Sequence, residues 1–170
     1  MSGPTPEGRR KTGSLERVRL YLEERGLADG LLSFDDRSTK TCALAAEAVG
    51  CEVGQIVKSL VFVADARPVL ALVAGDRRGD TAAIGALLGA SKVRFADADT
   101  VRAATGYAIG GVSPYDLPED LTVLIDDSLD RFATLYTAAG TPASMVRIDR
   151  EALLGLAGGR VARVSRDTGE

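Results

Sequence analysis

Apolar residues recur along the chain with two different periods, which predict strands and helices in turn. Residues Gln55 to Val63 and Val69 to Val73 are rich in β-branched and other apolar residues, a composition that favours strands. Between them, Asp65 to Pro68 carry turn residues. The two segments therefore predict an antiparallel hairpin. Further strands are expected at residues 31–34, 92–95, 121–126, 132–137, 145–148 and 160–164.

Helical spacing of apolar residues, followed in most cases by a glycine, predicts five short helices. The first runs from Ser14 to a stop at Gly26, and Arg17 stands where a capping-box glutamate would be more favourable. The other four are expected at residues 42–49, 81–88, 97–104 and 150–156.

The order of these elements indicates an α+β fold in a single domain. Strands and helices are interleaved too irregularly for a βαβ repeat, so we expect a mixed, barrel-like sheet flanked by short helices. A length of 170 residues fits one domain. We expect residues 1–13 to be a disordered leader, 14–166 to form the domain and 167–170 to be a frayed tail.

Composition narrows the classes of function. Hydrophobic residues make up 45% and charged residues 26% of the chain, and the net charge is −3. The acidic total argues against a protein that coats nucleic acid by bulk charge, although a local basic patch remains compatible with it. No apolar run reaches the length of a membrane span, and no secretory signal is present. The two cysteines suggest free thiols in a reducing cytoplasm.

The chain has no histidine. This excludes a His-dependent relay to a Ser or Cys nucleophile and any His-ligated metal site. An enzyme of this sequence would have to use Lys, Asp, Glu, hydroxyl groups, the backbone and the substrate itself. We expect no metal.

A glycine-rich segment, Thr105 to Pro114, is the first candidate for chemistry. Three glycines and a proline lie within these ten residues. Such a loop can present backbone N–H groups to a phosphate, a carboxylate or an oxyanion. From the residues alone, a plain turn between regular elements is the favoured interpretation.

Three further features interrupt the local pattern. Lys58 lies in a strand whose two faces are both mostly apolar, so it is either a surface lysine with a packed stem or a pocket lysine. Asp126 ends an apolar strand and could be a simple helix N-cap. Arg77 and Arg78 lie in a polar loop whose ordinary interpretation is a solvated turn.

Several motifs follow one another in order from about Thr41 to about Val164. They are a "K-[ST]-L" strand at Gln55–Phe62 and the segments 73–76, 88–96, 105–107, 110–114, 123–126 and 132–136. This ordered set resembles the YbaK/prolyl-tRNA-synthetase-associated domain family of aminoacyl-tRNA editing deacylases.

The resemblance implies hydrolysis of the ester of a mischarged tRNA, with no metal or organic cofactor. The family's key lysine falls on Lys58, and its G-x-x-x-P loop falls on Gly110 to Pro114. We hypothesise that backbone N–H groups at Gly110 and Gly111 stabilise the oxyanion, while Lys58 holds a phosphate or the ester carbonyl. Candidate substrate-binding residues are Ser59, Phe34, Thr41, Val112, Ser113, Pro114 and Asp126. Candidate tRNA contacts are Arg77, Arg78, Lys92 and Arg94, each of which could also be solvated surface charge.

The sequence departs from the family's Cys-tRNA(Pro) deacylases at three places. Pro-Tyr-Asp stands at 114–116 instead of Pro-Leu-Gly, Ala-Ala-Gly stands at 138–140 instead of Ser-Gly-Gly, and Met145 replaces an acidic residue. These changes make the expected pocket less polar. The edited amino acid is therefore left open between cysteine, alanine, serine and another small residue.

The resemblance predicts a freestanding, cytoplasmic trans-editing enzyme. Its partners would be the acceptor end of a mischarged tRNA and a synthetase such as prolyl-tRNA synthetase. A non-catalytic module that binds an acceptor end or an aminoacyl-like ligand is the alternative. A small-molecule esterase is a third interpretation.

Overall fold

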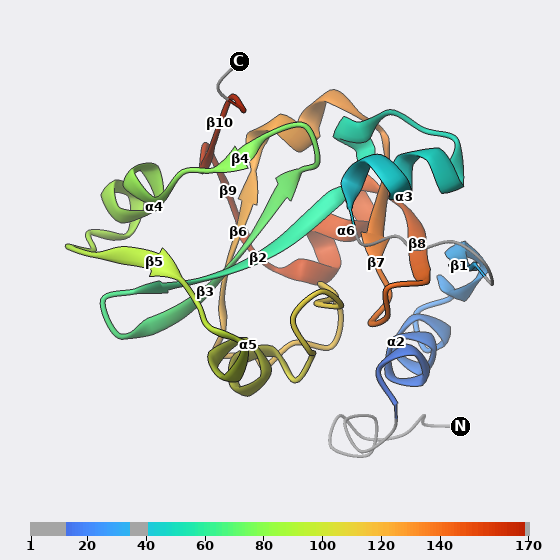
Figure 1. The fold of residues 1–170 in the computed structure, drawn as a ribbon. Coiled ribbons are helices and arrows are strands. Elements are labelled where there is room, and N and C mark those ends of the chain that lie inside the picture. Colours follow the sequence, from blue (N-terminus) through green and yellow to red (C-terminus); the bar gives the residue numbers. More distant parts are fainter. Residues whose placement is uncertain (1–12, 35–40, 169–170) are drawn as a thin grey trace.

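A five-stranded mixed sheet forms the centre of the computed structural model, which describes residues 13–34 and 41–168 (Figure 1). The strands follow the order β5-β2-β3-β6-β9. The predicted hairpin consists of β2 (Val57–Ala64) and β3 (Arg67–Ala74), and β5 (Val93–Phe95) lies antiparallel to β2. On the other side, β6 (Thr122–Asp126) and β9 (Arg160–Ala162) continue the sheet in parallel.

A three-stranded antiparallel sheet packs beside the central one. Its order is β1 (Leu31–Ser33), β8 (Ser144–Asp149) and β7 (Thr134–Ala138). A single parallel bridge between Ile56 and Tyr136 connects the start of β2 to β7. The junction of the two sheets is therefore at the beginning of the strand that carries Lys58.

Five α-helices surround the sheets in the described part of the chain. Three of them begin at an N-cap whose side chain accepts a backbone hydrogen bond, namely Thr41, Asp80 and Asp97, and each of these helices ends at a left-handed glycine. The helices are α2 (Ser14–Glu23), α3 (Cys42–Val49), α4 (Thr81–Leu88), α5 (Ala98–Thr105) and α6 (Arg150–Ala157). The predicted bounds of α3 and α4 are confirmed, because their start and stop signals are local.

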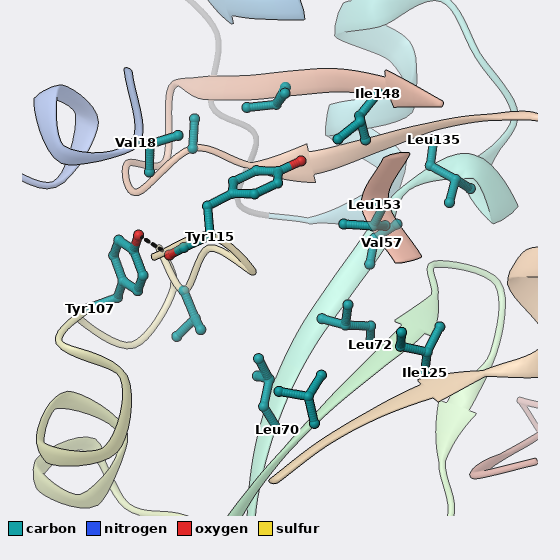
Figure 2. Close-up of a cluster of buried hydrophobic side chains, with 14 of the residues drawn as sticks. Val18, Val57, Leu70, Leu72, Tyr107, Tyr115, Ile125, Leu135, Ile148 and Leu153 are labelled. Atoms are coloured by element: carbon teal, nitrogen blue, oxygen red, sulfur yellow. Dashed lines mark hydrogen bonds between the residues drawn. The ribbon is translucent and has the colours of Figure 1, made fainter. Parts of the chain in front are cut away.

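The alternation of side chains along β2 and β3 divides the apolar core into two layers. One face, which includes Val57, Leu70 and Leu72, packs against α2, α6 and the buried Tyr107 and Tyr115 (Figure 2). The other face, with Phe62 and Val73, packs against Ile84 of α4. The side chains of Lys58 and Ser59 interrupt opposite faces near the start of β2.

The expected mixed sheet with flanking short helices is confirmed. The strand pairs that the structure describes leave β5 and β9 at the edges, so the barrel-like arrangement is open. The segment expected as one strand over 160–164 ends at Ala162. A short strand, β10 (Ser165–Arg166), then pairs with β4 (Arg78–Gly79), a segment expected to be loop.

The ends of the chain are only partly described. Asp167, placed by the sequence in a frayed tail, forms an ion pair with Arg77 at 2.7 Å. The leader expected over residues 1–13 lies outside the described residues except for Gly13, and residues 169–170 lie outside them as well. The domain limits stay a prediction.

Candidate active site

A cavity of about 430 Å³ lies along the part of β2 that β5 leaves unpaired. β5 pairs only with residues Phe62 to Ala64 of β2, so the preceding residues present a free strand edge. The first residues of α3, the residue Val101 of α5, the glycine-rich segment and the end of β7 close the cavity around this edge. Of the residues predicted from the sequence, the cavity brings together Lys58, Ser59, Thr41, Gly110 and Val112.

Lys58 is half-buried at the cavity, and its ammonium donates a hydrogen bond to the carbonyl oxygen of Arg77. Burial lowers the pKa of Lys58 below the ordinary lysine value, because the charged form loses water. Cys42 and Asp76 oppose this lowering, and Arg78 adds to it. Lys58 is thus the pocket lysine of the two alternatives, with a partly desolvated charge.

Ser59 contributes polar groups at the free edge of β2. The carbonyl of Val61 accepts a hydrogen bond from the N–H of Ala96, on the β5 side of the strand, at 3.0 Å. Backbone groups alternate between the two sides of an antiparallel strand, so Ser59 directs its N–H and C=O to that same side, beyond the end of β5. Its hydroxyl is buried with no hydrogen-bond partner among the described residues.

The two glycines proposed as oxyanion donors differ in their availability. Gly110 is exposed, adopts a φ of +88° and lines the cavity. The N–H of Gly111 already donates to the carbonyl of Ala108 at 3.0 Å. A Cβ at Gly111 would lie 2.9 Å from the carbonyl oxygen of Gly140. Gly110 therefore remains a possible donor to a ligand, whereas Gly111 permits close packing of the segment on the β7–β8 turn.

Other predicted binding residues lie behind the cavity wall. Ser113 and Pro114 are buried and follow Val112 away from the cavity. Phe34 packs against another buried cluster, which includes Met145. Phe34 itself does not line the cavity.

The structure does not bring Asp126 to the cavity. Its buried carboxylate accepts hydrogen bonds from the N–H of Val164 at 2.8 Å and the hydroxyl of Ser165 at 2.6 Å. It also accepts one from the N–H of Ser128, as the N-cap of the 3₁₀ turn that follows. Burial raises the pKa of Asp126, but these hydrogen bonds outweigh it and the net shift is downward.

The four candidate tRNA contacts fall into two groups. The side chain of Arg77 donates hydrogen bonds to the hydroxyl of Ser165 and to the carboxylate of Asp167, both at 2.7 Å. Arg78, Lys92 and Arg94 are exposed. Arg94 directly precedes Phe95, whose ring lines the cavity and is 58% exposed.

Sequence reasoning missed several residues of the cavity. Phe95 and Ile109 are exposed apolar residues at its rim, and Val101 forms a buried part of its wall. Met145, which the sequence comparison with the Cys-tRNA(Pro) deacylases placed in the expected pocket, does line the cavity. An isoleucine beside Gly110 in a polar loop was a usable signal, since exposed apolar residues often mark binding sites. Nothing in the pattern of α5 distinguishes Val101 from an ordinary core residue.

In the residues that the structure describes, no three His, Cys, Asp or Glu side chains are grouped so as to hold a metal ion. Among those same residues, every helix is too short or too polar to cross a membrane. What the cavity offers is a partly desolvated cation, serine groups and glycine backbone beside apolar walls. This set could position a polar ester and stabilise negative charge.

Comparison with known proteins identifies the family. Residues 36–156 match the aminoacyl-tRNA editing domain. The chain belongs to this family. The resemblance carried by the Lys58 strand and the glycine-rich segment is thereby confirmed, and both elements lie within the matched residues of the editing domain.

Two related proteins align with this chain over different lengths. An uncharacterised protein of Bacillus subtilis (strain 168), YwhH, is 33% identical over 136 residues, which cover 79% of this chain and 85% of the relative. The proline–tRNA ligase of Citrifermentans bemidjiense is 35% identical over 106 residues, 61% of this chain but 18% of the ligase.

A solved structure supports the fold assignment directly. The crystal structure of a candidate trans-editing enzyme for prolyl-tRNA synthetase has a TM-score of 0.82 and 39% sequence identity. The superposition covers 91% of this chain and 98% of that one. The mixed sheet with its flanking helices is thus the fold of the editing domain.

Proposed function

We propose that this chain is a deacylase that acts in trans on mischarged tRNA and removes a small amino acid, cysteine or alanine, from tRNA(Pro). One observation carries the proposal: a single cavity brings Lys58, the polar groups of Ser59 and the backbone of Gly110 against an apolar wall. Membership in the editing family and the overlap with a candidate trans-editing enzyme support it.

The apolar wall of the cavity accounts for the amino-acid part of the substrate. It includes Val57, Val61, Val101, Ala138 and Met145. A methyl group is well matched to such a wall, whereas a serine hydroxyl placed against it would lose hydrogen bonds to water. Among small amino acids we therefore propose alanine as the preferred one, with cysteine next.

The reaction needs a water molecule and the ester, but no protein nucleophile. Water oxygen adds to the ester carbonyl carbon, the bond from that carbon to the ribose oxygen breaks, and a proton from water passes to the ribose oxygen. The neighbouring ribose hydroxyl orients the water. The N–H of Gly110 faces the carbonyl oxygen as its negative charge develops.

Lys58 binds the terminal phosphate or the carbonyl region of the substrate as a compact positive charge. Its hydrogen bond to Arg77 holds the ammonium at the cavity before substrate arrives. The exposed cations Arg78, Lys92 and Arg94 extend the contact to the acceptor end. Few phosphate contacts are expected, in keeping with the acidic total of the chain.

A panel of aminoacyl-tRNAs tests this function. Purified protein is incubated with tRNA(Pro) charged with alanine, cysteine, serine or proline, and the loss of ester is followed. We expect rapid loss of alanine, slower loss of cysteine and no loss of proline. Binding of RNA without turnover on any substrate would instead indicate a non-catalytic module. Equal turnover of free aminoacyl esters would indicate a small-molecule esterase.

A further inference from the structure

Arg17 is buried on the inner face of α2, with 2% of its surface exposed. Its neighbours on this face are Val18, Tyr21 and Leu22, which belong to the apolar core. A buried guanidinium is costly unless its charge and N–H groups are paired. The partners of Arg17 therefore indicate what the residue does.

Those partners lie at the two ends of one loop. The Nη2 of Arg17 donates to the carbonyl oxygen of Thr105 at 3.2 Å, at the end of α5. Its Nε donates to the carboxylate of Asp116 at 3.1 Å, and Nη2 also donates to the backbone carbonyl of Asp116. One side chain thus ties residue 105 to residue 116, and the loop between them carries Gly110 and Val112 to the cavity.

The guanidinium also supports the interior of this loop. It lies over the ring of Tyr107, 4.1 Å from the ring centroid. The hydroxyl of Tyr107 donates to the carbonyl of Tyr115 at 2.6 Å, as Figure 2 shows. The hydroxyl of Tyr115 in turn pairs with that of Thr137 on β7 at 2.8 Å. The loop is therefore braced from its buried side by a continuous chain of polar contacts.

The backbone conformation at Asp116 is unusual for a residue other than glycine. Its φ is +55°, a left-handed conformation that favours glycine but that aspartate tolerates. A glycine here would lack the carboxylate that pairs with Arg17. Asp116 is 5% exposed and does not line the cavity, and neither does Arg17.

We propose that Arg17 and Asp116 form a clamp that positions the loop 106–115 for catalysis. The clamp holds the N–H of Gly110 and the side chain of Val112 in place without touching the substrate. In this way α2, whose bounds precede the matched family region, becomes part of the catalytic apparatus. The inference rests on the proposed deacylase function.

The test compares Arg17→Met, Arg17→Lys and Asp116→Asn with a control, Arg19→Met. Arg19 lies on the same helix but is more exposed, and it pairs with Glu16 and Glu23. Amide hydrogen exchange of residues 106–113 reports the order of the loop without requiring any activity. Steady-state deacylation of alanyl-tRNA(Pro) reports kcat and KM separately.

We expect Arg17→Met and Asp116→Asn to speed exchange in residues 106–113 and to lower kcat about tenfold, because a small misplacement of an oxyanion donor is costly. KM should change little. Arg17→Lys, which keeps the charge but not the planar fork, should recover part of kcat. Arg19→Met should behave as wild type.

Wild-type loop exchange and kcat in the folded variants would overturn the clamp, as would exchange that rises evenly over the whole domain. If Arg17→Met does not fold, Arg17→Lys and Asp116→Asn decide the question by the same readouts. If the wild-type protein deacylates no tRNA, the proposed function fails. A local rise in loop exchange would then still support the clamp itself.

Discussion

The ammonium of Lys58 donates a hydrogen bond to the backbone carbonyl of Arg77, which lies in the turn between β3 and β4. This contact joins the hairpin to the turn that follows it and keeps the positive charge at the edge of the cavity. Lys58 is half-buried, and its charged end is partly desolvated at the cavity. The lysine is therefore positioned before any ligand binds.

Replacement of Lys58 by methionine should remove the charge but keep the packed stem. We expect deacylation to fall about 10²–10³-fold, since a preorganised charge in a partly dry site contributes strongly to transition-state binding. The melting temperature should stay the same or rise, because a desolvated charge is removed. Arg67→Met, an exposed cation at the far end of the same hairpin, is the control. Wild-type turnover by folded Lys58→Met would exclude the lysine from the chemistry.

The lowered pKa of Lys58 predicts a pH dependence of binding. The charge of Lys58 is lost as pH rises through its folded pKa, which lies below the ordinary value of 10.5. Binding of a non-hydrolysable, amide-linked alanyl adenosine phosphate should weaken in that window, and Lys58→Arg should remove the effect. The free energy of unfolding should change in the opposite direction. Because burial disfavours the protonated lysine, wild type should become more stable relative to Lys58→Met as pH rises from the folded pKa of Lys58 to the ordinary value. Titration calorimetry measures the binding, and urea unfolding measures the stability, each as a function of pH.

Substitutions at Gly110, which lines the cavity, and at Gly111, which packs against Gly140, should separate backbone strain from packing. At Gly110 an added Cβ meets nothing within 4 Å, so alanine should cost only the roughly 1–2 kcal/mol of a left-handed residue, yet it should lower kcat by shifting the N–H. Gly111→Ala should lower both stability and kcat through its clash with Gly140. Gly89→Ala, also left-handed and open but remote from the cavity, is the control and should keep full kcat. Full activity in both Gly110→Ala and Gly111→Ala would remove this loop from the mechanism.

The size of the apolar pocket should set which amino acid is removed. Ala138 lines the cavity next to Met145, its partner across β7 and β8. Ala138→Leu should fill this space and reduce kcat/KM for alanyl-tRNA by roughly 10–200-fold. Ala133→Leu adds the same volume at an exposed position just before β7 and should have no effect. Equal kcat/KM in the two variants would show that the amino acid binds elsewhere.

Asp126 should matter for stability more than for chemistry. Asp126→Asn should reduce the free energy of unfolding by about 1–3 kcal/mol, because the hydrogen bonds from Val164 and Ser165 lose a charged acceptor. The folded pKa of Asp126 is lowered, so its contribution is present above the unfolded pKa and disappears as pH falls through the folded one. Urea unfolding at neutral pH and below about pH 4 measures this. A large loss of kcat with unchanged stability would restore Asp126 to the binding site.

Much of the secondary structure could be predicted because its signals lie within a few residues. Thr41 caps α3 through Leu44 and Gly50 ends it at a φ of +75°, so both ends are specified locally. The site was predicted less completely. The structure brings Lys58 to one cavity with Gly110 and Val112 of the glycine-rich segment. It leaves Asp126 outside that cavity, and a carboxylate after a strand gives no sign in the sequence of its distant partners.

Local sequence by itself determined the helices, the hairpin and the family motifs, because capping, turn geometry and strand propensity act between near neighbours. Tertiary structure alone decided which polar groups face the cavity and which form hydrogen bonds in the core. Arg17 and Asp116 lie 99 residues apart and meet only because α2 packs behind the glycine-rich loop. Buried polar groups must find partners wherever the fold places them, and one strand or helix does not contain that information.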